Sequence, residues 1–230
     1  MSITLGCLLL VACGLGGDDP RDPRAALQPF NELIGAWRGS GEVGLSRTQP
    51  WGETIVWSWR FKDQDAWLEC TVTGGKIYGG GELRSLADGR YQLTLHPVEK
   101  DRPAHVFIGK LAANGRSLIV EREDEEKKET HRLTLQFVGE IRYVLRSERR
   151  PQGRTQFVRD FQLAAQRAGE SLAKQPENTK PVCIVSGGLG TMTVSYKGVT
   201  YYVCCTGCRD EFNANPEKYI KEWEEKRKKP

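Results

Sequence analysis

Apolar and polar residues alternate along most of the chain between Phe30 and Ala165. In Thr54–Phe61 the apolar side chains fall on every second position and polar ones fill most of the positions between. A period of two is typical of strands that bury one face and expose the other. The same alternation recurs at residues 91–95, 133–137 and 141–145. We therefore predict a β-domain over residues 29–165.

Turn signals separate these alternating runs at a regular spacing. Asp88-Gly89, Asn114-Gly115 and Gly139-Glu140 each lie between two runs and are typical of hairpin turns. The spacing indicates about ten short strands, which favours an all-β barrel or sandwich. A closed antiparallel barrel would leave no strand edge exposed. The predicted fold class is mainly β, with a roughly ten-stranded antiparallel barrel.

Residues 182–224 follow a different pattern and form a second, smaller predicted module. Thr191–Tyr196 and Val199–Val203 flank Lys197-Gly198, which predicts a β-hairpin. A short helical stretch follows, and Asn215-Pro216 predicts the start of a second helix, with Asn as the cap. A module of this size buries too little surface to be stable alone, so we expect a bound metal to stabilise it.

The remaining segments lack periodicity. We predict a signal or lipoprotein segment at residues 1–17, a polar tether at 18–28, a linker at 166–181 and a charged tail at 225–230. The tether and the linker each contain two prolines, which is typical of connecting segments.

The N-terminus carries a short apolar run over residues 3–15. A run of this length falls below the ~20 residues that span a bilayer and suits the apolar region of a signal peptide. Leu10-Val11-Ala12-Cys13 resembles a bacterial lipobox, although no Lys or Arg precedes the run. The resemblance implies lipidation of Cys13 and a membrane-anchored lipoprotein of the bacterial cell envelope that faces the periplasm. A plain cleaved signal is the alternative.

Composition narrows the function classes. Hydrophobic residues make up 38% of the 230 residues and charged residues 28%, as in soluble globular proteins. The net charge of +4 is modest, whereas nucleic-acid binding goes with a clustered basic face, so we expect no nucleic-acid partner. The chain lacks the motifs of metalloproteases, serine hydrolases and phosphate-binding loops. We therefore predict that the protein is not an enzyme.

Four of the seven cysteines lie close together near the C-terminus: Cys183, Cys204, Cys205 and Cys208. Thiolates from a loop and from a turn that leads into a helix can hold a soft metal ion. Cys205 and Cys208 also form a C-x-x-C, which could act as a reversible disulfide. No thioredoxin-like βαβ pattern surrounds this C-x-x-C, but the residues alone leave both chemistries open.

The segment around these cysteines resembles the YHS and TRASH family of small metal-binding modules. The residues that carry the resemblance are Cys183-Ile184-Val185-Ser186-Gly187, Tyr196-Lys197-Gly198, Tyr201-Tyr202-Val203-Cys204, Cys208, Phe212, Pro216 and Tyr219. Ile184 stands where the family usually has Pro. The resemblance implies a treble-clef-like fold, metal binding by Cys183, Cys204 and Cys208, and a role in heavy-metal trafficking, resistance or sensing.

Three thiolates are one short of the closed shell of a structural zinc site, and Cys205 is a further candidate for the fourth position. Trigonal thiolate coordination suits Cu(I). We therefore predict an exported protein that captures one copper or zinc ion for trafficking, sensing or structural support at the cell envelope. A protein of the envelope would be a further partner.

The start of the β-domain has its own resemblance. Phe30–Trp37, with Gly35-x-Trp37, is similar to the opening of lipocalin-like and nitrobindin-like barrels. The resemblance implies that Trp37 closes the barrel base under an arginine from a late strand. The candidates for that arginine are Arg146, Arg149, Arg154 and Arg159.

A barrel also raises an alternative function, a carrier of haem or of a small lipid-like ligand. His131 shares a face with an apolar series and is the best inward-pointing histidine. Trp57 and Trp59 could line a cavity. A lone inward histidine is more often a hydrogen-bonded core residue than a ligand, and Cys70 is expected to be a buried strand residue.

Overall fold

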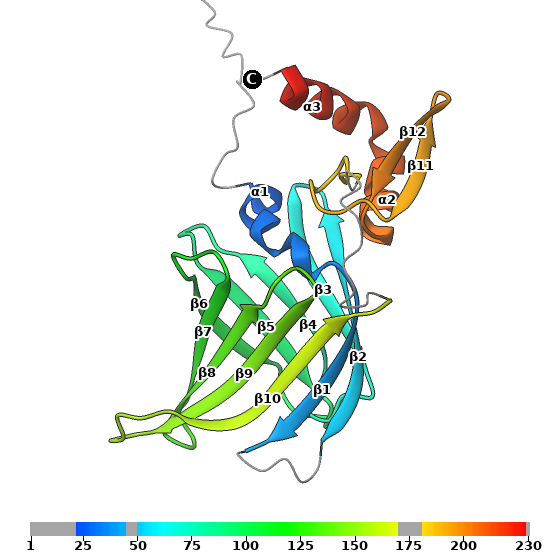
Figure 1. Ribbon diagram of the computed structural model, residues 1–230. Coiled ribbons are helices and arrows are strands. Elements are labelled where there is room, and N and C mark those ends of the chain that lie inside the picture. Colours follow the sequence, from blue (N-terminus) through cyan, green and yellow to red (C-terminus); the bar gives the residue numbers. More distant parts are fainter. Residues whose placement is uncertain (1–21, 45–49, 170–180, 229–230) are drawn as a thin grey trace, which may run out of the picture.

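The computed structural model describes residues 22–44, 50–169 and 181–228. Ten antiparallel strands close into a barrel in which β1 pairs with β10 (Figure 1). This architecture confirms the predicted fold class. The strands are β1 (Gly35–Val43), β2 (Trp51–Lys62), β3 (Asp65–Thr73), β4 (Tyr78–Ser85), β5 (Tyr91–Pro97), β6 (His105–Leu111), β7 (Ser117–Asp124), β8 (Glu129–Phe137), β9 (Arg142–Pro151) and β10 (Val158–Arg167).

The predicted alternation and turns account for the barrel wall. Along β2, Ile55, Trp57 and Trp59 are buried while the residues between them are partly or fully exposed. Gly89 and Gly115 have φ angles of 75° and 65° in the hairpin turns, a left-handed conformation that glycine adopts without steric cost. Since each strand exchanges hydrogen bonds with two neighbours, the wall has almost no free edge.

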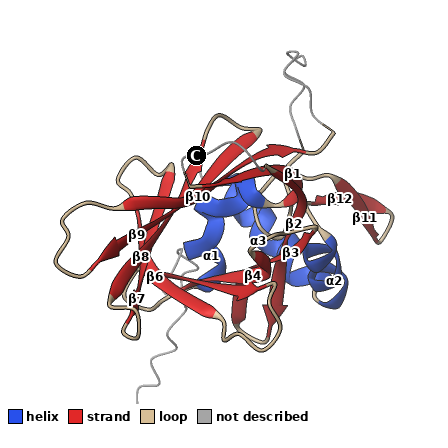
Figure 2. Ribbon diagram, turned by 90° about the horizontal axis from the view of Figure 1, so that it is seen from below, coloured by secondary structure: helices blue, strands red, loops and turns tan. Residues whose placement is uncertain are grey.

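One end of the barrel is closed by helix α1 (Pro23–Leu27) and the 3-10 helix η1 (Gln28–Leu33), which lie across it in Figure 2. Leu27, Phe30 and Leu33 are completely buried. The expected polar tether at residues 18–28 is therefore wrong from Asp22 onward. The Asp22 side chain accepts a hydrogen bond from the Arg24 N–H and caps α1, and burial of Leu27 fixes the helix to the barrel.

Trp37 lies at the base of the barrel, as expected, but the arginine that covers it is Arg167. The Arg167 guanidinium lies 4.5 Å from the centre of the indole ring and donates to the carbonyls of Glu32 and Ile34, at 2.6 and 2.8 Å. Arg146, Arg149, Arg154 and Arg159 do not fill this role. The alternation predicted for the late strands ended at Ala165, whereas β10 continues to Arg167, so the sequence-based candidates lay too early in the chain.

The barrel interior is filled by side chains. The cavity lined by Trp57, Cys70, Tyr143 and their neighbours measures about 50 Å³, while pockets for small-molecule ligands span about 300–1,000 Å³. His131 points inward but does not line that cavity; it lies 3.7–3.9 Å from the carboxylates of Asp124, Glu129 and Asp160. This cavity is too small for haem.

The C-terminal module contains a two-stranded hairpin, β11 (Met192–Tyr196) and β12 (Val199–Val203), followed by helices α2 (Thr206–Ala214) and α3 (Pro216–Lys228). Lys197 and Gly198 have φ angles of 50° and 79° in the hairpin turn, as the sequence predicted. α3 extends through most of the expected charged tail. Within the described ranges no helix is long and apolar enough to cross a membrane. The expected signal segment, including Cys13, lies outside them.

We expect Arg167→Ala to lower the free energy of unfolding by about 2–3 kcal/mol, because charged hydrogen bonds to two carbonyls are lost at a half-buried site that covers Trp37. Urea denaturation followed by tryptophan fluorescence measures the change. Arg146→Ala is the matched control, since Arg146 is exposed on the neighbouring strand and its loss should change stability by less than about 0.5 kcal/mol. Equal effects of the two substitutions would contradict the assignment of Arg167.

Candidate metal centre

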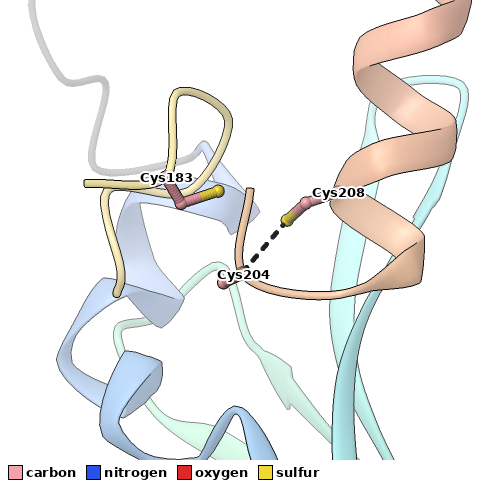
Figure 3. A group of neighbouring side chains, drawn as sticks. All are labelled: Cys183, Cys204 and Cys208. Atoms are coloured by element: carbon pink, nitrogen blue, oxygen red, sulfur yellow. Dashed lines mark hydrogen bonds between the residues drawn. The ribbon is translucent and has the colours of Figure 1, made fainter. Parts of the chain in front are cut away.

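Three thiols converge inside the C-terminal module. The sulfur atoms of Cys183, Cys204 and Cys208 all lie within 4.8 Å of one another. Figure 3 shows Cys183 on a loop and Cys208 on a helix, and Cys204 directly follows β12. Cys183 and Cys208 are completely buried and Cys204 is 6% exposed. In the described part of the chain this is the one group of three or more His, Cys, Asp or Glu side chains with ligand atoms this close.

Cys183 lies in a tight loop whose backbone points toward its sulfur. The Ser186 N–H lies 3.4 Å from Cys183 Sγ, and the Gly187 N–H donates to the Cys183 carbonyl at 2.9 Å. Gly187 has a φ angle of 78°, which lets the chain reverse direction here. Because a backbone N–H favours the charged form of the sulfur it faces, the loop is suited to hold a thiolate.

Cys204 and Cys208 are placed by the junction between β12 and α2. Cys204 directly follows the strand and Cys208 lies in the first turn of the helix, so their Sγ atoms are 3.5 Å apart. The positive end of the α2 dipole favours a thiolate at Cys208. Burial works in the opposite direction and raises the pKa of the Cys208 thiol well above its ordinary value.

The pKa values of the three thiols shift in different directions. Hydrogen bonds from the thiols of Cys204 and Cys208 lower the pKa of Cys183 to about 2. The pKa of Cys205, outside the trio, is lowered as well, because the same two thiols hydrogen bond to it, whereas the pKa values of Cys204 and Cys208 are raised. A metal cation that binds these cysteines would displace the protons of their thiols, because metal binding to cysteine releases protons.

The donor set also fits a metal by size. Zinc–sulfur bonds of about 2.3 Å place two sulfurs of a tetrahedral site about 3.8 Å apart. The observed Sγ separation of 3.5 Å between Cys204 and Cys208, with all three sulfurs inside 4.8 Å, is close to that spacing. Only small side-chain adjustments would bring all three sulfurs to one ion.

Cys205 is close to the trio but faces the barrel. Its Sγ is 3.9 Å from Cys204 Sγ and accepts a hydrogen bond from the Trp59 N–H at 3.4 Å. It does not belong to the group of sulfurs that lie within 4.8 Å of one another. The structure therefore separates Cys205 from the other three.

Ser186 is a residue of the site that the sequence did not single out. Its side chain is 1% exposed, and its Oγ lies 3.4 Å from Cys204 Sγ. A hydroxyl in this position can donate to a thiolate and orient it. The signal was present in Cys183-Ile184-Val185-Ser186-Gly187, where the motif has Ser or Thr before Gly.

The module docks on a free strand edge of the barrel. β1 begins at Gly35, opposite Trp57, so the last five residues of β2 have no partner on that side. The N-terminus of α2 covers this edge: Cys205 Sγ meets the Trp59 N–H, and Gly207 lies so close to the Trp59 carbonyl that a Cβ would be 1.9 Å from its oxygen. Only glycine fits there without displacing the helix.

Two polar side chains from the lid, which consists of α1 and η1, hold the loop that carries Cys183 (residues 183–188). Asn31 accepts a hydrogen bond from Trp59 Nε1 at 3.0 Å and donates to the Ser186 carbonyl at 3.0 Å. Arg24 donates to the Val185 carbonyl at 3.3 Å and forms an ion pair with Glu222 at 2.7 Å. The barrel thus contacts both the loop of Cys183 and the helix of Cys208.

Residues 190–223 match the model of the YHS domain family, which confirms the resemblance predicted from the sequence motif. Cys183 lies outside the matched residues, although the fold brings it to Cys204 and Cys208. No curated protein matches the chain. The chain is therefore a ten-stranded barrel that carries a YHS-type module at its C-terminal end.

Two solved structures are similar to this chain. The crystal structure of Rv2717c from M. tuberculosis has 16% sequence identity and a TM-score of 0.42, and the match covers 62% of this chain and 96% of that one. The S-type phycobiliprotein lyase CPES from Guillardia theta has 13% identity and a TM-score of 0.39, with 62% and 91% covered.

We expect Asn31→Ala to loosen the cysteine loop, because it removes both hydrogen bonds and leaves Trp59 Nε1 buried without an acceptor. The docked loop should lose about 1–3 kcal/mol of stability. This loss should appear as faster amide hydrogen exchange at residues 183–188. Asn213→Ala, at an exposed position on α2, is the control. Exchange that is unchanged in Asn31→Ala would contradict the role of Asn31 in docking.

Proposed function

We propose that this protein is a metal-binding protein, not an enzyme, and that it captures one soft or transition metal ion through Cys183, Cys204 and Cys208. The convergence of three buried sulfurs within 4.8 Å carries this proposal, and the YHS match at residues 190–223 supports it. Copper and zinc are the candidate ions, since both accept thiolate ligands.

Burial indicates how the ion would be held. The three cysteines are at most 6% exposed, and the loop and helix that carry them are fixed to the barrel. An ion in this position would exchange slowly and would hold together a module that is too small to be stable through its own core. Structural support is the role that this geometry favours, with storage or sensing of the ion as a consequence of its slow release.

We expect the reduced wild-type protein to bind one equivalent of zinc or Cu(I), and Cys183→Ser, Cys204→Ser or Cys208→Ser each to weaken binding, since each removes one of three charged ligands. Inductively coupled plasma mass spectrometry of the purified, reduced proteins measures the metal content. Cys70→Ser is the matched control, because Cys70 is a buried thiol in the barrel wall and its loss should leave the metal content unchanged.

The redox alternative, a disulfide between Cys205 and Cys208, gives a different result in the same samples. Thiol titration with and without a chelator separates the two functions. If metal protects the thiols, removal of metal exposes them to the reagent. Metal content that is unchanged in both Cys204→Ser and Cys208→Ser would contradict the proposed function.

We further propose that the protein is exported and anchored to the cell envelope through Cys13. The basis is the apolar run at residues 3–15 and the small residue before the cysteine. Cys13→Ala should move the protein from the membrane fraction to the soluble fraction of the producing bacterium, and should abolish incorporation of radiolabelled palmitate. Labelling that persists in Cys13→Ala would contradict lipidation at this residue.

A further inference from the structure

We propose that Cys205 determines which metal the site prefers, and that the barrel controls it. In the docked module Cys205 is held against β2 and three thiolates face the ion. When the module is released from β2, Cys205 becomes free to supply a fourth. This inference rests on the proposed metal site and adds a selectivity residue and a conformational control to it.

Cys205 lies next to the three proposed ligands but outside their group. Its Sγ is 3.9 Å from Cys204 Sγ, close to the spacing of about 3.8 Å between two sulfurs of one zinc ion. Cys205 does not belong to the group of sulfurs within 4.8 Å of one another, so it does not lie that close to all three of the others. A rotation of one side chain, accompanied by a small shift of the helix start, would bring Cys205 onto an ion held by the other three.

The barrel opposes that rotation. The Trp59 N–H lies on the unpaired edge of β2, and Cys205 Sγ is its acceptor at 3.4 Å. Turning Cys205 toward the ion would leave this buried N–H without a partner, which is unfavourable. The contact between Gly207 and the Trp59 carbonyl fixes the helix start at the same point. The docked module therefore presents three thiolates to the ion, because Cys205 stays bound to β2.

The number of thiolates decides which ion binds best. Structural zinc sites are almost always closed tetrahedra of four ligands, whereas a set of three soft thiolates without a fourth ligand suits Cu(I). The docked form is therefore selective for Cu(I) and the released form for Zn²⁺. By thermodynamic linkage, Zn²⁺ favours release of the module from β2 to the same extent as release favours Zn²⁺.

The experiment compares Gly207→Ala with wild type in the full-length, reduced protein. The added Cβ cannot coexist with the Trp59 carbonyl, while alanine itself is the best helix former, so the substitution separates α2 from β2 without harming the helix. Zn²⁺ and Cu(I) affinities are measured by competition with chromophoric chelators. Gly52→Ala is the control, because a Cβ at Gly52, on β2, meets nothing within 4 Å.

We expect Gly207→Ala to raise the ratio of Zn²⁺ to Cu(I) affinity by about 10-fold or more, the range in which groups beyond the direct ligands tune metal sites. The double variant Gly207→Ala/Cys205→Ser should lose that rise. The absorption of bound Co²⁺ should change from a three-thiolate to a four-thiolate spectrum in Gly207→Ala alone. Asn31→Ala, which weakens docking from the other side, should shift the ratio in the same direction.

An unchanged ratio in both Gly207→Ala and Asn31→Ala, or a rise that persists in the double variant, would overturn the role of Cys205. Circular dichroism of the metal-loaded variants shows whether the module has kept its helices, and Asn31→Ala is the deciding variant if Gly207→Ala has lost them. Failure of wild type to bind either metal would instead refute the proposed function, so the two failures are distinguishable.

Discussion

The backbone of Trp59 is the point on which the two parts of this protein depend. β2 runs past the start of β1, which leaves the N–H and the carbonyl of Trp59 facing outward from a closed barrel. An unpaired strand edge is a liability in a β-protein. Here it is covered by the start of α2, through Cys205 and Gly207. The same contact fixes the helix that carries Cys208, so the geometry of the sulfur cluster depends on a hydrogen-bonding edge of the barrel.

Local patterns predicted most of the fold. Alternation along β2, glycine in the hairpin turns and the Lys197-Gly198 turn each specify a conformation within a few residues, and the structure confirms them. The cysteine spacing led to Cys183, Cys204 and Cys208 because a family motif records which distant residues meet. Their assignment as metal ligands remains a prediction.

Features that depend on distant contacts were not predictable in the same way. Arg167 lies two residues beyond the last clear alternation, and only the closed barrel brings it to Trp37. The segment before Gln28 has the composition of a tether, yet Leu27 is buried because it packs against the apolar end of the barrel. The position of Cys205 depends on Trp59, which is 146 residues away, and no local pattern indicates that contact. In each case the partner, not the segment itself, decides the structure.

Arg24 has a consequence for the order in which the chain folds. It contacts Val185 and Glu222, which are 161 and 198 residues further along the chain. Closing loops of this length is slow compared with pairing neighbouring strands. On a ribosome the lid helix is made before the barrel strands, but its contacts with Val185 and Glu222 become available only after the whole barrel has been made. The barrel strands can therefore pair before the contacts of Arg24 with Val185 and Glu222 form, and the closed end is consolidated after the barrel wall.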